Sequence, residues 1–227
     1  MANSTISTVS VHTLEQLIKD RHSTRKFLPR PVPEALVHDA LDVARYAPSN
    51  SNIQPWRMVF ISGPALDRLK TALVDAAESG TPNIPPLPDS FKHFRSELGR
   101  EVYGVGMGIT HDDKEGRRVA VLRNFEFFGA PLAAIVCMHQ DLGPADALSV
   151  GMYLQTLLLA LTDKGVDSCV EVSVTGYPDV LRKELGLGVE LLIICGLAIG
   201  YSDPEFPANL LHIGRVSVEE TVSFVNE

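Results

Sequence analysis

The feature that most constrains the fold is a long apolar stretch at residues 145–164. Its large apolar side chains include Leu148, Met152, Tyr153, Leu157, Leu158, Leu159 and Leu161, and Gly165 follows it. A run of this length that is apolar nearly all round predicts a buried central helix ending at Gly165. Such a helix needs cover on every side, so we expect one side of it to lie at a subunit interface.

Residues that start or stop helices place further helices along the chain. Residues 13–16, Thr-Leu-Glu-Gln, form a predicted capping box in front of a short helix. Pro33 suits the first turn of one helix, which Pro48 stops. Pro64 suits the first turn of another, which ends at Gly80. Residues 91–128 indicate a polar helix that the glycine-rich residues 103–108 interrupt.

Strand signals are fewer. Residues 58–61, 132–138 and 191–195 are short apolar runs, typical of central strands covered on both faces, and residues 197–199 extend the last. Residues 80–90 contain four prolines, which exclude regular structure and predict either a mobile linker or a lid over a site. Long helices intermixed with a few strands predict a single α+β domain over residues 1–227.

Charge and composition exclude several classes of partner. The formal net charge is −8, whereas binding to nucleic acid needs a basic face. No apolar run approaches the roughly 18 residues of a membrane helix, and no signal peptide is recognisable, so we expect neither a membrane partner nor secretion. The three cysteines, Cys137, Cys169 and Cys195, have apolar neighbours and are predicted to be free thiols in the cytoplasm.

Against this acidic background, a basic cluster follows the first predicted helix. Residues 21–26 read Arg-His-Ser-Thr-Arg-Lys, three cations and two hydroxyls. Guanidinium groups bind phosphate oxygens bidentately, and each charge-assisted hydrogen bond contributes roughly 1.5–3 kcal/mol. The cluster therefore suits one phosphate group, although the same cations also suit the negative end of a helix dipole.

A polar loop follows the second predicted helix and ends in the only tryptophan. Residues 48–56 read Pro-Ser-Asn-Ser-Asn-Ile-Gln-Pro-Trp. These residue types are common in turns, but amides and hydroxyls held between prolines also suit a planar ligand with a polar edge. Together with the basic cluster, the loop indicates a phosphorylated heteroaromatic cofactor, and flavin mononucleotide (FMN) fits both halves.

Two other motifs have simpler interpretations than the functional ones they suggest. Gly104, Gly106 and Gly108 resemble a dinucleotide-binding fingerprint, but no predicted strand precedes them, which favours a glycine turn lining a pocket. Residues 111–113, His-Asp-Asp, have no further His or Cys at the spacing of metal ligands. We therefore predict no metal site there.

In their order along the chain, these segments resemble the nitroreductase family of FMN-dependent, NAD(P)H-using oxidoreductases, and most of all its nitrobenzoate-reductase type. The resemblance covers nearly the full length and rests on residues 21–25, 48–56, 123–131, 165–169, 177–178, 200–204, 207–209 and 215. It implies a three-layer α/β/α fold with a mixed, mostly antiparallel sheet. It also implies an obligate homodimer with two FMN sites at the subunit interface.

The resemblance further implies roles for individual residues. The cofactor-binding residues are expected to be Arg21, His22, Ser23, Thr24, Arg25, Pro48, Ser49, Asn50, Asn52, Gln54, Asn124, Val172, Ser173, Val174 and Arg215. The basic cluster and Arg215 would hold the phosphate, ribityl chain and pyrimidine end, while loop 48–54 would come from the other subunit. Asn124 would contact the polar edge of the ring, and backbone groups of residues 172–174 would approach flavin N5. Two positions depart from the family pattern: Glu171, where a neutral amide is expected, and residues 110–111, where a basic residue is common.

The implied chemistry is hydride transfer from NADH or NADPH, through flavin N5, to a small electron-poor acceptor such as a nitroaromatic, quinone or enone. A cation such as Arg25 would stabilise the anionic reduced ring, and no catalytic side-chain nucleophile is needed. One open face of the ring would accept both partners in turn, which predicts ping-pong kinetics. Two alternatives remain open: a flavin-dependent dehydrogenase or oxidase that uses oxygen, and a non-catalytic flavin-binding protein.

Overall fold

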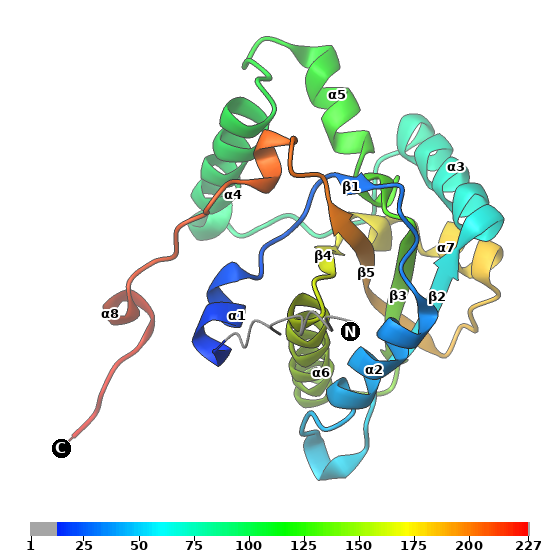
Figure 1. The fold of residues 1–227 in the computed structure, drawn as a ribbon, viewed down its shortest axis with the longest axis vertical. Helices are drawn as coiled ribbons and strands as arrows, with labels where there is room; N and C mark the ends of the chain where they lie inside the picture. The colour runs from blue at the N-terminus through cyan, green and yellow to red at the C-terminus, as the bar shows by residue number, and fades with distance from the viewer. Residues whose placement is uncertain (1–12, 227) are drawn as a thin grey trace, which may run out of the picture.

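A computed structural model describes residues 13–226, which are built around one five-stranded sheet (Figure 1). Its strands are β1 (Phe27–Leu28), β2 (Arg57–Ser62), β3 (Leu132–His139), β4 (Asp167–Glu171) and β5 (Leu191–Ser202). The strand order is β1-β5-β3-β2, and β4 also pairs with β5. Each of these strand pairs is antiparallel, and a parallel pairing occurs only at the isolated bridge between Ser23 and Ser168 within the described residues.

Helices cover both faces of the sheet because successive strand residues point into two different apolar cores. On one face, Ala133, Ile135 and Cys137 of β3 pack with α3 (Gly63–Ser79) and α7 (Pro178–Leu185). On the other face, Ala134 and Val136 pack with α2 (Glu34–Ala44) and α6 (Pro144–Asp163). The predicted α+β, three-layer α/β/α fold is confirmed, with β3 and β5 as its buried central strands.

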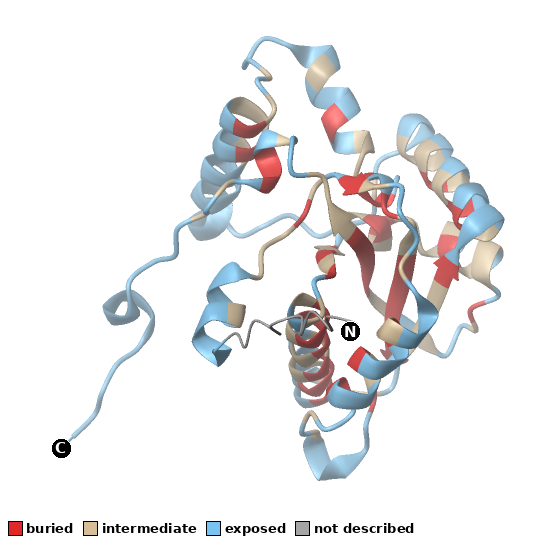
Figure 2. Cartoon of the chain, viewed as in Figure 1, coloured by how far each residue is buried: buried red, intermediate tan, exposed pale blue. Residues whose placement is uncertain are grey.

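Helix α6 is the predicted apolar helix, and this chain covers only part of it. Leu157 and Leu161 are fully buried against the sheet, whereas Leu148 is 65% exposed. The short helix α1 (Leu14–Asp20) contacts α6 and leaves Leu14 and Ile18 exposed, as the pale blue of α1 in Figure 2 shows. Contrary to the expectation from the sequence, α6 is by length and composition apolar enough to span a membrane, but its buried side belongs to the sheet core.

Between α3 and β3 the chain leaves the three layers, and we refer to residues 80–122 as the excursion. It contains η2 (Asp89–Phe91), α4 (Lys92–Gly99), the π-helical η3 (Arg100–Gly106) and α5 (Lys114–Leu122), near the top of Figure 1. Gly106 packs against η6 (Pro207–Asn209), so closely that a Cβ atom there would lie 2.7 Å from the Ala208 Cβ. Loop 80–88 is fastened too, because the Asn83 N–H donates to the Gly176 carbonyl at 3.0 Å.

The remaining elements are η1 (Asn50–Asn52), η4 (Phe127–Gly129), η5 (Ser173–Gly176) and α8 (Val218–Thr221). Two strands escaped prediction. β1 has only two residues, and β4 reads Asp-Ser-Cys-Val-Glu, in which Ser168 and Glu171 are polar yet buried. The predicted interruption at residues 103–108 comes later than expected, because helical backbone continues to Gly106 and the turn falls at Gly108, with φ of +68°.

Candidate functional site

The basic cluster and the C-terminal segment meet in one cavity of about 520 Å³, which we name the basic cavity. Arg21, at the C-terminal cap of α1, begins its wall. The predicted cofactor residues that line it are Arg21, His22, Ser23, Arg25 and Arg215. Lys26 of the cluster does not join them, because its ammonium group pairs with Asp203 at 2.9 Å. Three guanidinium groups thus share one space in which Asp20 is the one acidic lining residue.

Arg25 is fixed by neighbours on both sides. Its N–H donates to Asn209 Oδ1 (2.7 Å), its Nη1 donates to the Ser23 carbonyl (3.1 Å), and Arg123 Nη2 donates to the Arg25 carbonyl (2.7 Å). Asn209 is 3% exposed, and its Nδ2 also donates to the carbonyls of Lys26 (2.8 Å) and of Asp203 (3.0 Å). Asn209 therefore ties η6 to the segment after α1 by two hydrogen bonds, makes a third within its own segment to Asp203, and holds Arg25 in place.

Two predicted cofactor residues have buried polar atoms without a partner. His22 Nε2 and Thr24 Oγ1 accept or donate no hydrogen bond within residues 13–226. An unpaired buried polar group costs about 1–3 kcal/mol, so one on a cavity wall points to a ligand. His22 lines the basic cavity, whereas Thr24 is fully buried and does not. The His22 ring, whose Nδ1 lies 2.8 Å from the Asp20 carbonyl, is therefore placed to meet a polar ligand.

A second cavity, of about 480 Å³ and named the central cavity, adjoins the basic cavity through Arg25 and Leu98, which line both. The predicted residues in its wall are Arg25, Asn124, Val172 and Ser173. The excursion supplies apolar cover from Ile84, Pro85, Leu87 and Leu98. Val174 is instead fully buried in the core. The basic cavity gathers cations, whereas the central cavity has mostly apolar walls with Arg25 and Arg95 as its cations. Such a pair of adjoining cavities suits a phosphorylated planar ligand.

Strand β4 ends beside the central cavity with a buried carboxyl group. Glu171 is 2% exposed, and its Oε1 has no hydrogen-bond partner within residues 13–226. Burial raises the pKa of Glu171 well above its ordinary value, against the opposing effects of the Cys169 thiol and of Arg25. Burial also raises the pKa of Cys195 to about 12. Burial thus favours the uncharged form of this carboxyl group, and in that form Glu171 would match in charge the amide that the resemblance predicts there.

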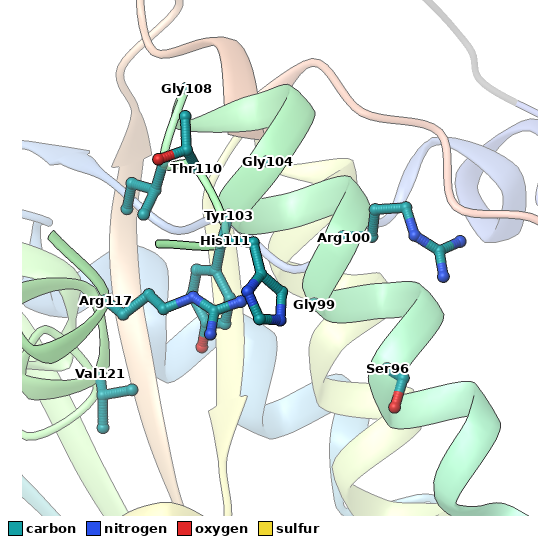
Figure 3. Close-up of a pocket in the computed structure, with 11 residues that line it drawn as sticks. Ser96, Gly99, Arg100, Tyr103, Gly104, Gly108, Thr110, His111, Arg117 and Val121 are labelled. Carbon is teal, nitrogen blue, oxygen red and sulfur yellow. The ribbon is translucent and has the colours of Figure 1, made fainter. Parts of the chain in front are cut away.

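The excursion forms a third cavity, of about 780 Å³, which we name the outer cavity (Figure 3). Gly99, Tyr103 and Val121 line both this cavity and the central one, so the two are continuous along that wall. Gly104 and Gly108 lie on its wall, in agreement with the predicted pocket-lining role of the glycine-rich segment.

The charged side chains of the outer cavity, Arg100 and Arg117, are cationic. Arg100, His111 and Arg117 line it, and in Figure 3 Arg117 and His111 reach into the same space while Arg100 points away. Within the described residues, neither arginine has a carboxylate at ion-pair distance, and His111 has only Asp112, at 3.6 Å. The neighbouring Arg118 differs, because Glu78 (2.6 Å) and Glu115 (2.8 Å) already engage its guanidinium group.

The polar loop lies apart from these cavities in the chain. It lies at the end of α2 and α6 that faces away from the excursion in Figure 1, and it lines none of the three. The Asn50 N–H donates to Ser149 Oγ (3.1 Å) and its side chain donates to Asp146 Oδ1 (3.2 Å), which fastens the loop to α6. Within one protomer, the predicted residues Pro48, Ser49, Asn50, Asn52 and Gln54 are therefore not brought to the basic cluster.

The same loop is held in a costly conformation. Ser51, Asn52 and Gln54 have φ of 49°, 55° and 49°, in the left-handed region that non-glycine residues rarely adopt. Each such residue costs about 1–3 kcal/mol and persists where surrounding contacts or function require it. One such contact is internal, since the Gln54 N–H donates to Ser49 Oγ at 3.1 Å. Trp56, by contrast, stacks on Tyr153 with ring centroids 4.4 Å apart and belongs to the core.

Sequence reasoning missed several residues that build this site. In the sequence, Asn209 stands out only within residues 207–209, one of the segments that carry the family resemblance, and its hydrogen bond to Arg25 joins positions 184 residues apart. Arg123 and Leu98 were assigned no role, and Arg117 was not singled out. No local signal marks them, because each acquires its role only when the excursion and η6 fold over the segment after α1.

Comparison with known proteins agrees with this fold and site. Residues 18–201 match the Nitroreductase family. The chain is 35% identical to the nitrobenzene nitroreductase of Ectopseudomonas oleovorans, over 94% of this chain and 97% of that protein. It is 32% identical to the 4-nitrobenzoate reductase of Pseudomonas putida, over 93% and 95%.

A solved structure gives the same result. The FMN-dependent nitroreductase NfnB from Mycobacterium smegmatis, in complex with NADPH, superposes with a TM-score of 0.86 at 33% identity, over 93% of this chain and 97% of that one. The cofactor pair predicted from the sequence is therefore the pair of this neighbour. A match over most of the chain, the shared three-layer fold and the arginine-lined cavity lead to one conclusion: the chain belongs to the nitroreductase family.

Proposed function

We propose that this protein is an FMN-dependent oxidoreductase that reduces small electron-poor acceptors, nitroaromatics foremost, with NADPH or NADH. The observation that carries the proposal is the meeting of Arg21, Arg25 and Arg215, from both ends of the chain, in a cavity that opens at Arg25 into a second, apolar-walled one. This arrangement fits a ligand with a phosphate at one end and a planar ring at the other. The nitroreductase relatives support the acceptor class.

Specific residues would hold each part of FMN. Arg21 and Arg215, together with the unpaired Nε2 of His22, would bind the phosphate. Arg25 lies where the two cavities join and would neutralise negative charge at the ring, while Asn124 and Ser173 would offer polar groups to its edge. FMN, when bound, supplies hydride transfer from a reduced nicotinamide to the acceptor.

The outer cavity would admit the two substrates in turn, which is the basis for ping-pong kinetics. It is continuous with the central cavity along Tyr103 and Val121. Its unpaired Arg117 gives it positive charge on a chain whose net charge is −8. A site of this sign favours anionic groups, such as the phosphates of NADPH or the carboxylate of an acidic nitroaromatic.

Of the two roles predicted for residues 80–90, linker or lid, loop 80–88 would have the second: it would be a lid that shields the central cavity. Its Ile84, Pro85 and Leu87 line the central cavity. The Tyr177 hydroxyl donates to the Gly80 carbonyl at 3.0 Å, which adds to the bond between Asn83 and Gly176 in fixing the loop over η5. The chain would then form a single domain in which loop 80–88 is part of the site.

The enzyme would work as a homodimer in which loop 48–54 of one protomer completes the site of the other. Exposed apolar side chains on α1 and α6, Leu14 and Leu148 among them, supply a face for the second copy. The C-terminal segment runs away from the three layers in Figure 1, and Phe224 is 82% exposed there. A strained polar loop exposed on the surface also fits a role outside its own chain. The three free, buried thiols suit the cytoplasm.

The test of this function is the double variant Arg21→Ala/Arg215→Ala. Loss of two charge-assisted phosphate contacts, each worth roughly 1.5–3 kcal/mol, should raise the Kd for FMN by about 100-fold or more. Titration of the apoprotein with FMN measures this directly by quenching of flavin fluorescence. The matched control Arg30→Ala/Arg68→Ala removes the same charge outside the cavity and should leave the Kd unchanged. Full FMN binding by the first variant would refute the phosphate assignment.

A further inference from the structure

The buried carboxyl group of Glu171 has no role in the proposed function so far, and its surroundings are unusual for an acid. It lies on β4 opposite Gly196 of β5, where the missing glycine side chain leaves room for it, and a Cβ on Gly196 would be 3.4 Å from the Glu171 Cβ. The nearby side chains of Val174 and Phe127 are apolar. Oε1 has no hydrogen-bond donor within residues 13–226.

Few titratable or charged groups face this carboxyl group. Cys169 lies on the same face of β4, Cys195 on the adjoining β5, and Arg25 on the segment after α1. The neighbouring η4 and η5 contribute the apolar Phe127 and Val174. Arg25 is therefore the single cation that acts on Glu171 among the described residues.

We propose that Glu171 is a positioning residue that carries a proton at neutral pH, and that this proton keeps the charge of Arg25 available to an anionic ligand in the two cavities that Arg25 lines. An ionised Glu171 would be a buried anion with one oxygen lacking any donor, which is strongly unfavourable. Its charge would also act on the nearby Arg25 and offset the positive charge at the junction of the two cavities. The protonated acid avoids both costs.

Arg25 and Glu171 would therefore have different roles. Arg25 lines the basic and central cavities and meets the ligand, whereas Glu171 lies behind the wall formed by its chain neighbours Val172 and Ser173. Glu171 would act only through Arg25. The charge state of the Glu171 carboxyl group would then set how strongly an anion binds in the cavities that Arg25 lines.

The protonation is tested on the full chain by infrared spectroscopy at pH 7. The variant Glu171→Gln keeps the size and neutrality of the side chain. Subtracting its spectrum from that of the wild type should leave the carbonyl stretch of one carboxylic acid, since all other carboxyl groups cancel. A carboxylate band in its place would overturn the inference. If Glu171→Gln does not fold, titration of the wild type alone decides, because an acid band that persists at pH 7 must disappear at higher pH.

The effect on Arg25 is tested with FMN as the probe. At pH 7 the Kd for FMN should agree within about twofold between wild type and Glu171→Gln. If Glu171 were ionised, the variant would free Arg25 and bind FMN at least about fivefold more tightly, on the usual scale of coupling energies. As the pH rises, the wild-type Kd must increase when the acid band is lost, while that of Glu171→Gln stays level. A purely structural role predicts no such difference. The FMN measurement rests on the proposed FMN site, whereas the infrared measurement does not. If neither the wild type nor Glu171→Gln binds FMN, the proposed function is refuted, but the protonation of Glu171 is not.

Discussion

The side chain of Asn209 makes the clearest quantitative prediction about how this site is held together. It is 3% exposed and makes three hydrogen bonds, one from the Arg25 N–H and two to the carbonyls of Lys26 and Asp203. Each bond contributes about 0.5–1.5 kcal/mol net, and Asn209→Ala removes all three. It leaves the Arg25 N–H without a partner in the interior, whereas the carbonyls of Lys26 and Asp203 still accept from the N–H groups of Asp203 and Phe206. The variant should therefore lose about 3 kcal/mol of the free energy of unfolding. For a chain of this length, that loss lowers Tm by about 6–12 °C.

Urea unfolding at fixed protein concentration measures this loss, because a dimer's stability depends on concentration. Asn83→Ala is the matched control: Asn83 is exposed, and its bond to Gly176 comes from the backbone and survives the substitution. It should cost less than about 0.5 kcal/mol. Asn209→Ala should also weaken FMN binding, since Arg25 loses its anchor. A loss of stability no larger than that of Asn83→Ala would refute the reasoning.

Four further predictions follow from the site and its surroundings. Gly176→Ala places a Cβ 2.5 Å from the Pro82 Cβ of loop 80–88, so it should cost about 1–3 kcal/mol and speed proteolysis of that loop; unchanged cleavage would contradict the contact. Arg117→Ala should raise KM for NADPH by up to about fivefold at low salt, whereas Arg118→Ala, whose cation is already paired, should not. Leu148→Asp should convert the proposed dimer to monomers in sedimentation experiments, and an intact dimer would exclude this face. Folding raises the pKa of Glu171, so between the unfolded and the folded pKa the folded chain holds one more proton than the unfolded chain. In that pH range the free energy of unfolding, relative to that of Glu171→Gln, should fall by up to about 1.4 kcal/mol per pH unit as the pH rises. A difference that stays constant with pH in urea titrations would contradict this.

The sequence predicts the helices of this fold well because their signals are local. The capping box at Thr13, the proline at the start of α3 and the length of α6 all lie within the segments that they define. Strand β4 was missed because its stability comes from pairing with β5 and not from its own polar composition. Glu171 in this strand is unusual because its carboxyl group is buried, and the sequence alone does not show that burial.

The candidate site divides in the same way. Arg21 and Arg25 are recognisable because they cluster in the chain, and their predicted partner Arg215 does line the same cavity. The place of loop 48–54 relative to them depends on a second copy, so its role stays a prediction. The hydrogen bonds of Asn209 and the walls of the outer cavity join segments far apart in sequence, which no local pattern reveals.

The excursion has a consequence for how such an enzyme diversifies. Its two ends attach to α3 and to the segment before β3, while the cofactor-side groups Arg25 and Glu171 belong to the sheet and its margins. Mutations that accumulate in residues 80–121 can thus remodel the central and outer cavities, whereas Leu122 already packs against the sheet core. Exchange of this one insertion between homologues should transfer acceptor preference as a module, and directed evolution aimed at new pollutants or prodrugs would begin there.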